Sequence, residues 1–182
     1  MSPADLTLAE ASAAIAKRRL SPVEYLDALR ARFDALEPRL NTPILPLWDA
    51  AREDAKKAGR RIARSGPRSP IDGLPVGLKD IIDLAGHATT CHSRHLLDNV
   101  KQADAAVVAR LRAAGAVFPA KLATHEFAIG GPAFDLPFPP ARNPWNTAHH
   151  PGGSSSGSGA IVGAGILPAA LGTDTGGSIR HP

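Results

Sequence analysis

The first third of the chain carries apolar side chains at helical spacing, and the helices that this pattern predicts begin with recognisable caps. Thr7 and Ser21 each stand three residues before a glutamate, which is the spacing of a capping box. Asp49 is expected to cap a third, strongly charged helix. We therefore expect helices over 7–19, 22–36 and 49–64, of which the first two form a helical hairpin.

Beyond residue 70 the chain changes to short apolar runs that alternate with helical stretches. One helical stretch is expected to begin at an Asp104 cap and to end at Gly115. Strands are predicted over 74–82, 116–118 and 168–172, an edge strand at 44–48, and helices over 157–165 and from 177 onward. This alternation predicts one mixed α/β domain, in which residues 1–65 form a helical region and residues 70–182 the core segment.

A long segment between these elements, 130–153, is rich in proline and glycine and predicts a loop. Loops of this length in a compact domain are usually functional or are packed by their own aromatic side chains. We expect Trp145 to pack the loop in this way.

Composition and charge exclude some classes of partner. Of 182 residues, 43% are hydrophobic and 21% charged, and the formal net charge is +4. These proportions are ordinary for a globular domain with its own core. The basic residues are scattered, with acids nearby and few aromatics between them, which favours solvated helix faces over a nucleic-acid patch. We expect no direct binding of nucleic acid.

The single cysteine, Cys91, allows no internal disulfide and fits a reducing compartment. We interpret it as a small buried hydrophobe rather than a nucleophile. The N-terminus lacks the pattern of a signal peptide, and the longest apolar run, at 160–171, is too short and too glycine-rich to span a bilayer. These features predict a cytoplasmic protein that does not bind membranes.

Two clusters of serine set in glycine lie near the end of the chain. They occupy 152–157 and 176–178, and the apolar run at 160–171 separates them. Glycine beside serine lets the backbone approach a ligand closely while a hydroxyl stays in place. With Asp174 and Arg180 beside the second cluster, the pattern indicates a built site rather than a linker.

A serine hydroxyl needs a base within hydrogen-bond reach before it becomes a useful nucleophile. None of the seven histidines accompanies a clear nucleophile elbow, and Ser156–Gly159 matches that spacing only through repetition. We interpret His125 as a structural hydrogen-bonding group. No zinc-type spacing and no phosphate-loop motif is present, so metal and nucleotide sites are not expected.

The other candidate base is Lys79. It stands among apolar residues within the run at 74–82, and burial lowers the pKa of an amine. Two ordinary alternatives stay open, because a lysine at this position can extend its amine to the surface or pair with its neighbour Asp80.

Three blocks of the sequence resemble the amidase signature family of serine hydrolases. They are GLPVGLKD, GGSSSGSG and ALGTDTGGSIRHP, in that order, and two connecting segments, KLATHEF and RNPWN, are similar as well. The resemblance implies the amidase signature fold, a mixed β-sheet core flanked by helices. It also implies that the family's catalytic lysine falls on Lys79, its bridging serine on Ser154 and its nucleophile on Ser178.

The same resemblance implies how the site is supported. A cis peptide bond is expected between Gly153 and Ser154, and Ser155 is expected to support the hydrogen-bond network. The backbone N–H groups of Thr175, Gly176, Gly177 and Ser178 are expected to form an oxyanion hole. Asp174 and Arg180 are expected to orient this loop.

The implied activity is hydrolysis of a small-molecule carboxylic amide, with no cofactor, no metal, and a possible homodimer in the full-length form. Pro119-Ala120 stands where the family commonly has a glycine, and family members are more than twice as long, so this chain reads as an N-terminal portion. Two alternatives remain open. One is the amidase subunit of a glutamyl-tRNA(Gln) amidotransferase, and the other is an inactive truncated fragment.

Overall fold

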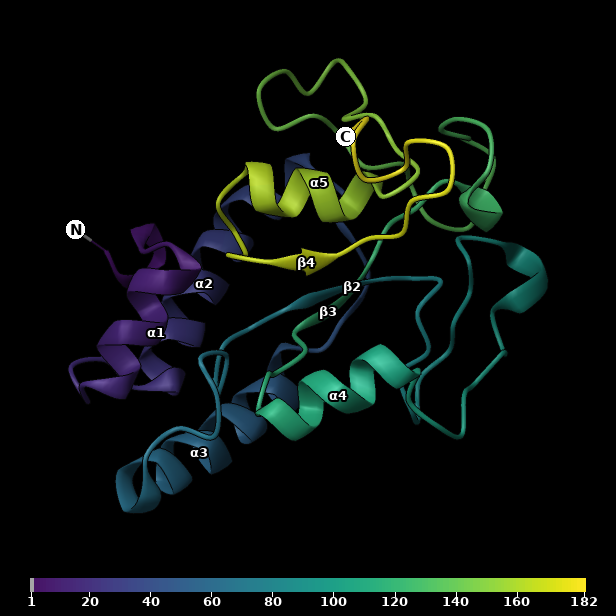
Figure 1. The fold of residues 1–182 in the computed structure, drawn as a ribbon. Helices are drawn as coiled ribbons and strands as arrows, with labels where there is room; N and C mark the ends of the chain where they lie inside the picture. The colour runs from purple at the N-terminus through teal and green to yellow at the C-terminus, as the bar shows by residue number, and fades with distance from the viewer. Residues whose placement is uncertain (1) are drawn as a thin grey trace.

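The N-terminal helices begin where their capping residues predict, in a computed structural model that describes residues 2–182. The Thr7 hydroxyl accepts the N–H of Glu10, and the Glu10 carboxylate accepts the N–H of Thr7 at 2.8 Å. The second capping box, at Ser21, is also complete. Helices α1 (Leu8–Ala16) and α2 (Pro22–Leu36) follow these boxes and form the predicted hairpin (Figure 1).

Two other predicted caps are wrong. Helix α3 (Trp48–Ser65) has Leu47 at its cap position and places Asp49 in its first turn. Helix α4 (Ala106–Ala114) begins without a side-chain cap, because the Asp104 carboxylate accepts hydrogen bonds from Arg112 and from the N–H of Ala85. The end of α4 is as predicted, with Gly115 in the left-handed conformation.

A mixed four-stranded sheet forms the centre of the molecule. It consists of β1 (Pro43–Pro46), β2 (Gly77–Lys79), β3 (Ala120–Leu122) and β4 (Ala170–Leu171), in the order β1-β3-β2-β4. Strand β1 runs antiparallel to β3 at one edge, whereas β3, β2 and β4 run parallel to one another. The fifth helix is α5 (Ser156–Gly163). Short 3-10 turns lie at Pro3–Asp5, Glu37–Arg39, Arg94–Leu96 and Glu126–Ala128. The mixed α/β fold is therefore confirmed.

The paired strands are shorter than the apolar runs that predicted them. Only three residues of the run at 74–82 form β2, and the run at 116–118 contributes a single bridge before β3 begins. The helix expected from 177 onward is a turn instead, in which the Gly177 carbonyl accepts the N–H groups of Arg180 and His181. Apolar character at these positions reflects burial rather than strand pairing.

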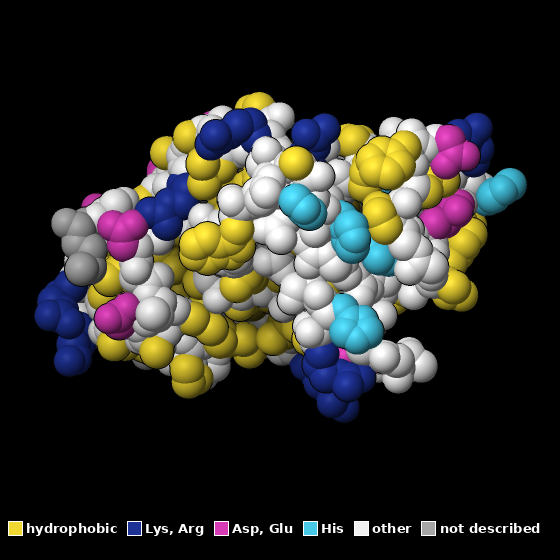
Figure 2. Space-filling model, turned by 90° about the horizontal axis from the view of Figure 1, so that it is seen from above, with side chains coloured by type: hydrophobic (Ala, Val, Ile, Leu, Met, Phe, Trp, Pro, Cys, Tyr) yellow, Lys and Arg dark blue, Asp and Glu magenta, His cyan; other side chains and the backbone are white. Residues whose placement is uncertain are grey.

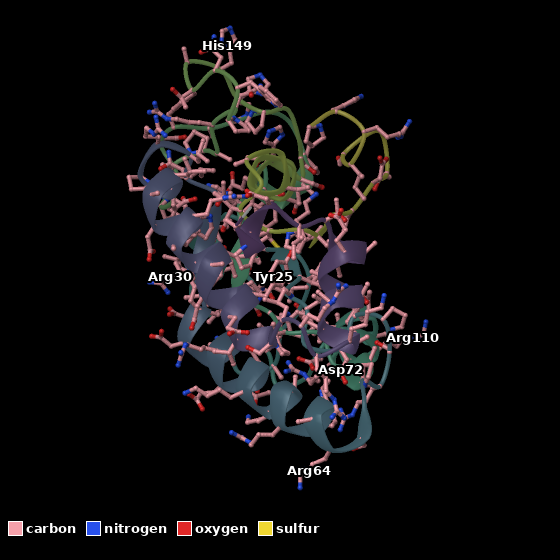
Figure 3. All side chains as sticks on the ribbon, turned by 90° about the vertical axis from the view of Figure 1, so that its left-hand side faces the viewer. Tyr25, Arg30, Arg64, Asp72, Arg110 and His149 are labelled. Carbon is pink, nitrogen blue, oxygen red and sulfur yellow. The ribbon has the colours of Figure 1, made fainter. Side chains whose placement is uncertain are left out.

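Helices cover both faces of the sheet. Helix α5 lies on one face and α4 on the other (Figure 1). The larger hydrophobic cluster joins α1, α2, α3 and α5 to β3 through residues such as Tyr25, Leu122 and Ile161, and the smaller cluster packs Leu78 of β2 with Val108 of α4. In Figure 3 Tyr25 lies within the helical layer, whereas Arg30 and Arg64 point outward.

The predictions for Trp145 and for Cys91 need correction. Trp145 is 89% exposed and does not pack the 130–153 loop. Cys91 is half-buried rather than buried, and its backbone lies in the left-handed region with φ of 52°.

A fully buried ion pair crosses from β3 to the end of β2. The Lys121 ammonium lies 2.6 Å from Asp80 Oδ1, and both side chains are 0% exposed. Lys121 also donates to the carbonyl of Ala88 and to Thr89 Oγ1, while Thr90 donates to Asp80 Oδ2 from its N–H and its hydroxyl. These bonds tie the 88–90 segment to the sheet.

Removing one member of this pair leaves the other charge buried without compensation. We expect Lys121→Met to lower the free energy of unfolding by about 3–5 kcal/mol, as measured by urea denaturation. Lys57→Met is the matched control, because it breaks the exposed pair with Asp54 and should cost less than about 1 kcal/mol. Adding Asp80→Asn to Lys121→Met should recover part of the loss. Equal stabilities of Lys121→Met and Lys57→Met would show that the buried pair is not a stabilising element.

Candidate active site

Strand register places the side chain of Lys79 on the face of the sheet that α5 covers. Lys79 lies opposite Leu122 of β3, and Leu78 lies opposite Lys121. Successive side chains of a strand point to opposite faces. Leu78 packs with α4, so Lys79 points toward α5 and the serine-rich segment before it.

The amine of Lys79 is buried and is surrounded by three hydroxyl groups. Lys79 Nζ lies 2.8 Å from Ser154 Oγ, 3.0 Å from Ser155 Oγ and 2.9 Å from Thr173 Oγ1. Its side chain is 0% exposed. Neither ordinary alternative for Lys79 applies, because the amine does not reach the surface and Asp80 pairs with Lys121 instead.

Burial lowers the pKa of Lys79 to about 8 because the charged form loses its hydration. The nearby Asp174 carboxylate opposes this shift by favouring the ammonium. A substantial fraction of the amine is therefore neutral near pH 8, which is the form that can accept a proton.

Ser154 is held by a distinctive backbone. The peptide bond between Gly153 and Ser154 is cis, as the family resemblance implies. The Ser154 carbonyl accepts the N–H of His125 at 3.1 Å. A Cβ at Gly153 would lie 2.4 Å from the His125 ring, so only glycine fits between this ring and the serine.

Ser178 lies beside Ser155, whose N–H donates to the Ser178 carbonyl at 3.1 Å. The structure thus brings Lys79, Ser154 and Ser155 into direct contact and places Ser178 next to them through the backbone. Within residues 2–182 no hydrogen bond joins the hydroxyls of Ser154 and Ser178.

Asp174 organises the loop that carries Ser178. Its carboxylate accepts two hydrogen bonds from Arg180 and one each from the N–H groups of Gly177 and Ile179. The Arg180 guanidinium, with these N–H groups, lowers the pKa of Asp174 well below its ordinary value. Asp174 and Arg180 lie where the expected orienting role requires.

The backbone N–H groups before Ser178 differ from the expected oxyanion hole at one position. The Gly177 N–H donates to Asp174 Oδ1 at 2.8 Å, so it is not free for a ligand in this structure. In the part of the chain that the structure describes, the N–H groups of Thr175, Gly176 and Ser178 have no hydrogen-bond acceptor. These three donors remain available for an anion.

The histidines lie outside this network. Histidine side chains gather on the face shown in Figure 2, but among the described residues none bonds to a serine hydroxyl. The Nδ1 of His125 lies 3.1 Å from the Gly130 carbonyl, as expected for a structural group, and burial lowers the pKa of this imidazole. The hydrogen bonds of the site therefore do not include a Ser-His pair.

Thr173 is the contact that sequence reasoning missed. Its hydroxyl bonds to Lys79, and its backbone N–H and carbonyl both bond to Ser155 Oγ at 3.3 Å. Thr173 lies within the block ALGTDTGGS, five residues before Ser178. Its place in this block was the one signal in the sequence that could have indicated Thr173. A contact between a hydroxyl and a base far away in the chain has no characteristic spacing.

The described chain has neither a membrane-spanning helix nor a cluster of metal ligands. No helix within residues 2–182 combines the length and the apolar character that a membrane span requires. In the same part of the chain, no three side chains of histidine, cysteine, aspartate or glutamate gather as a potential metal site.

Sequence comparison relates the chain to one type of amidotransferase subunit. The glutamyl-tRNA(Gln) amidotransferase subunit of Roseiflexus sp. (strain RS-1) is 48% identical over 177 residues, which are 97% of this chain and 36% of that protein. The corresponding subunit of Geobacter sulfurreducens is 48% identical over 178 residues, 98% of this chain and 36% of that protein. The chain thus spans about a third of the length of the curated relatives it matches.

Two solved structures with the same fold are named as amide-cleaving enzymes. A fatty acid amide hydrolase superposes with a TM-score of 0.93 at 27% identity, covering 98% of this chain and 32% of that one. The native peptide amidase from Stenotrophomonas maltophilia superposes with a TM-score of 0.86 at 33% identity, covering 96% and 37%. The family model Amidase matches residues 24–182. The chain therefore belongs to the amidase family.

Proposed function

We propose that the protein hydrolyses a carboxylic amide to a carboxylate and ammonia or an amine, with Ser178 as nucleophile. The observation that carries the proposal is the buried amine of Lys79, held 2.8 Å from Ser154 Oγ with its pKa lowered to about 8. An amine that is partly neutral near pH 8 and touches a serine hydroxyl is suited to act as a general base. Family membership supports amide hydrolysis in general.

In the proposed first step Lys79 accepts the proton of Ser154 while Ser154 accepts the proton of Ser178. The Ser178 oxygen attacks the amide carbon and forms a C–O bond, and the carbonyl electrons move to the oxygen. The N–H groups of Thr175, Gly176 and Ser178, which have no acceptor among the described residues, would stabilise this oxyanion. Removing one such donor typically lowers the rate by about 100- to 1,000-fold.

The tetrahedral intermediate then collapses. The C–N bond breaks, and the leaving nitrogen takes the proton that Lys79 holds, by way of Ser154. Water attacks the resulting acyl-enzyme ester through the same relay and releases the carboxylate. These steps use only side chains, backbone groups and water. The proposed mechanism therefore requires no metal and no organic cofactor.

A second candidate function is that of an amidotransferase subunit. The relatives at 48% identity carry that name. In this case the same chemistry would release ammonia from glutamine and deliver it to a partner subunit. Cytoplasmic location, a homodimer of a longer form, and the lack of nucleic-acid and membrane binding stay predictions.

Labelling with a fluorophosphonate tests the nucleophile. We expect the probe to label Ser178, because its hydroxyl would displace fluoride from phosphorus, and we expect Ser178→Ala to abolish labelling. Ser154→Ala and Lys79→Met should slow labelling by about 100- to 10,000-fold, the usual contribution of general-base catalysis. Mass spectrometry of the labelled peptide locates the adduct.

The matched control is Ser158→Ala. This serine belongs to the same glycine–serine segment, but its hydroxyl donates to the Leu171 carbonyl rather than to the Lys79 network. Labelling of Ser158→Ala should resemble that of the parent protein. Labelling of folded Ser178→Ala at the parent rate would remove Ser178 as the nucleophile, and a folded parent that is not labelled would support the inactive alternative.

The charge of Lys79 can be followed directly by NMR of protein with ¹³C at the lysine ε-carbons. We expect one signal, absent in Lys79→Met, to titrate near pH 8, whereas exposed lysines titrate near pH 10.4. The unfolded chain binds this proton up to the higher pH and the folded chain only up to about 8, so stability should rise with pH between these values. A Lys79 signal that titrates with the exposed lysines would refute the general-base assignment.

Ammonia release separates the two candidate functions. A free-standing amidase should hydrolyse primary amides without any partner, and glutamine should hold no special rank among them. An amidotransferase subunit should prefer glutamine, and its rate should rise when the other subunits are added. Assay of the protein with glutamine and a panel of simple amides, with and without the other amidotransferase subunits, distinguishes these outcomes.

A further inference from the structure

The three hydroxyls around Lys79 cannot all play the same part. A neutral amine has two N–H groups to donate and one lone pair that accepts. Ser154, Ser155 and Thr173 each place a hydroxyl oxygen 2.8–3.0 Å from Nζ. In the neutral state, one hydroxyl must therefore donate to the lone pair while the other two accept an N–H.

Ser155 is excluded as the donor by its other bonds. Its hydroxyl proton goes to the Thr173 carbonyl at 3.3 Å, and the same oxygen accepts the N–H of Thr173 at 3.3 Å. A serine hydroxyl has one proton and two lone pairs. The remaining lone pair of Ser155 can only accept an N–H from Lys79.

The second N–H and the lone pair of Lys79 are then divided between Ser154 and Thr173. Neither hydroxyl has another side-chain partner among the described residues. The proposed function requires that Ser154 give its proton to Lys79, and the inference rests on that function. We propose that Thr173 is a positioning residue, whose Oγ1 accepts the second N–H of Lys79 and so directs the lone pair at Ser154.

This arrangement lets the proton move without rearrangement of the amine. When Ser154 gives up its proton, the O–H bond breaks and a third N–H bond forms on Lys79. The resulting ammonium donates to Ser154, Ser155 and Thr173 at the positions they already occupy. Without the Thr173 hydroxyl, the second N–H would compete for Ser154 Oγ and the lone pair would lose its direction.

Thr173 is fixed relative to the strand that carries Lys79. Strand β4 ends at Leu171, which pairs with Leu78 of β2. The backbone carbonyl and N–H of Thr173 both bond to Ser155 Oγ. A Cβ at Gly172 would lie 2.8 Å from Ser155 Oγ, so the glycine permits this approach. These contacts hold the backbone of Thr173 beside Ser155, and from there its Oγ1 lies 2.9 Å from Lys79 Nζ.

The charged groups near Lys79 are bonded to other partners and do not orient its amine. Asp174 favours the ammonium, but Arg180 and two N–H groups hold its carboxylate. Asp80 is paired with Lys121. The neighbouring His125 has a lowered pKa. No carboxylate among the described residues bonds to the Lys79 amine, so hydroxyls alone decide where its protons point.

The test compares Thr173→Val, which keeps the shape but removes the hydroxyl, with Thr173→Ser, which keeps the hydroxyl. The readouts are the pH dependence of Ser178 labelling by the fluorophosphonate and the NMR titration of Lys79 in the same protein. For Thr173→Val we expect the labelling rate above the midpoint to fall about three- to tenfold, the effect of one lost hydrogen bond. The Lys79 midpoint should move to lower pH, because an ammonium loses more than a neutral amine when an acceptor is removed.

Thr173→Ser should keep both the rate and the midpoint near those of the parent. A Thr173→Val protein with the parent's rate and midpoint would overturn the proposal. So would a lower rate with an unchanged midpoint, which is the result of a purely structural role, or an equal loss in Thr173→Ser. The far-UV circular dichroism and melting temperature of each variant establish that it is folded.

The two readouts separate this inference from the proposed function. If the folded parent is not labelled at Ser178, the proposed function fails. The NMR titration of Lys79 then still reports whether the Thr173 hydroxyl contacts the amine. If the parent is labelled and Thr173→Val behaves like the parent in both measurements, the result supports the proposed function and refutes the role of Thr173.

Discussion

The site depends on a buried lysine amine whose hydrogen-bond partners within residues 2–182 are hydroxyls and not carboxylates. A buried ammonium is costly unless a carboxylate compensates it. Around Lys79 the partners are Ser154, Ser155 and Thr173, which bond to the neutral amine as well as to the charged one. Burial then lowers the pKa to about 8, and the same contacts hold the amine beside a serine.

The second buried lysine shows how sheet geometry separates two environments. Lys121 lies on the neighbouring strand, but its register partner is Leu78 rather than Lys79, so it points to the opposite face. There it compensates Asp80 and ties down the 88–90 segment. The step of one residue along β2 thus keeps the carboxylate of Asp80 away from the Lys79 amine. A carboxylate bonded to Lys79 would favour the ammonium and raise the pKa of the amine back toward its ordinary value.

Local signals in the sequence predicted the parts of the fold that local interactions determine. The capping boxes at Thr7 and Ser21 form because both partners are three residues apart. Asp104 was predicted as a cap from the same kind of signal, but the more distant Arg112 and Ala85 bind its carboxylate. The contacts of Lys79 with Ser154 and Thr173 join positions 75 and 94 residues apart. No spacing rule reveals them. The apolar run marked Lys79 as a candidate base, but only the family resemblance paired it with Ser154.

The segment after β4 links the base to the nucleophile. Thr173 contacts Lys79, Asp174 holds the loop, and Ser178 follows within five residues. Asp174 also takes the N–H of Gly177, so the carboxylate that shapes the loop occupies one of the four N–H groups expected to bind an oxyanion. Any ligand that needs this donor must displace Asp174 Oδ1. Since the Asp174 charge also favours protonated Lys79, such a displacement would alter the oxyanion donors and the base together.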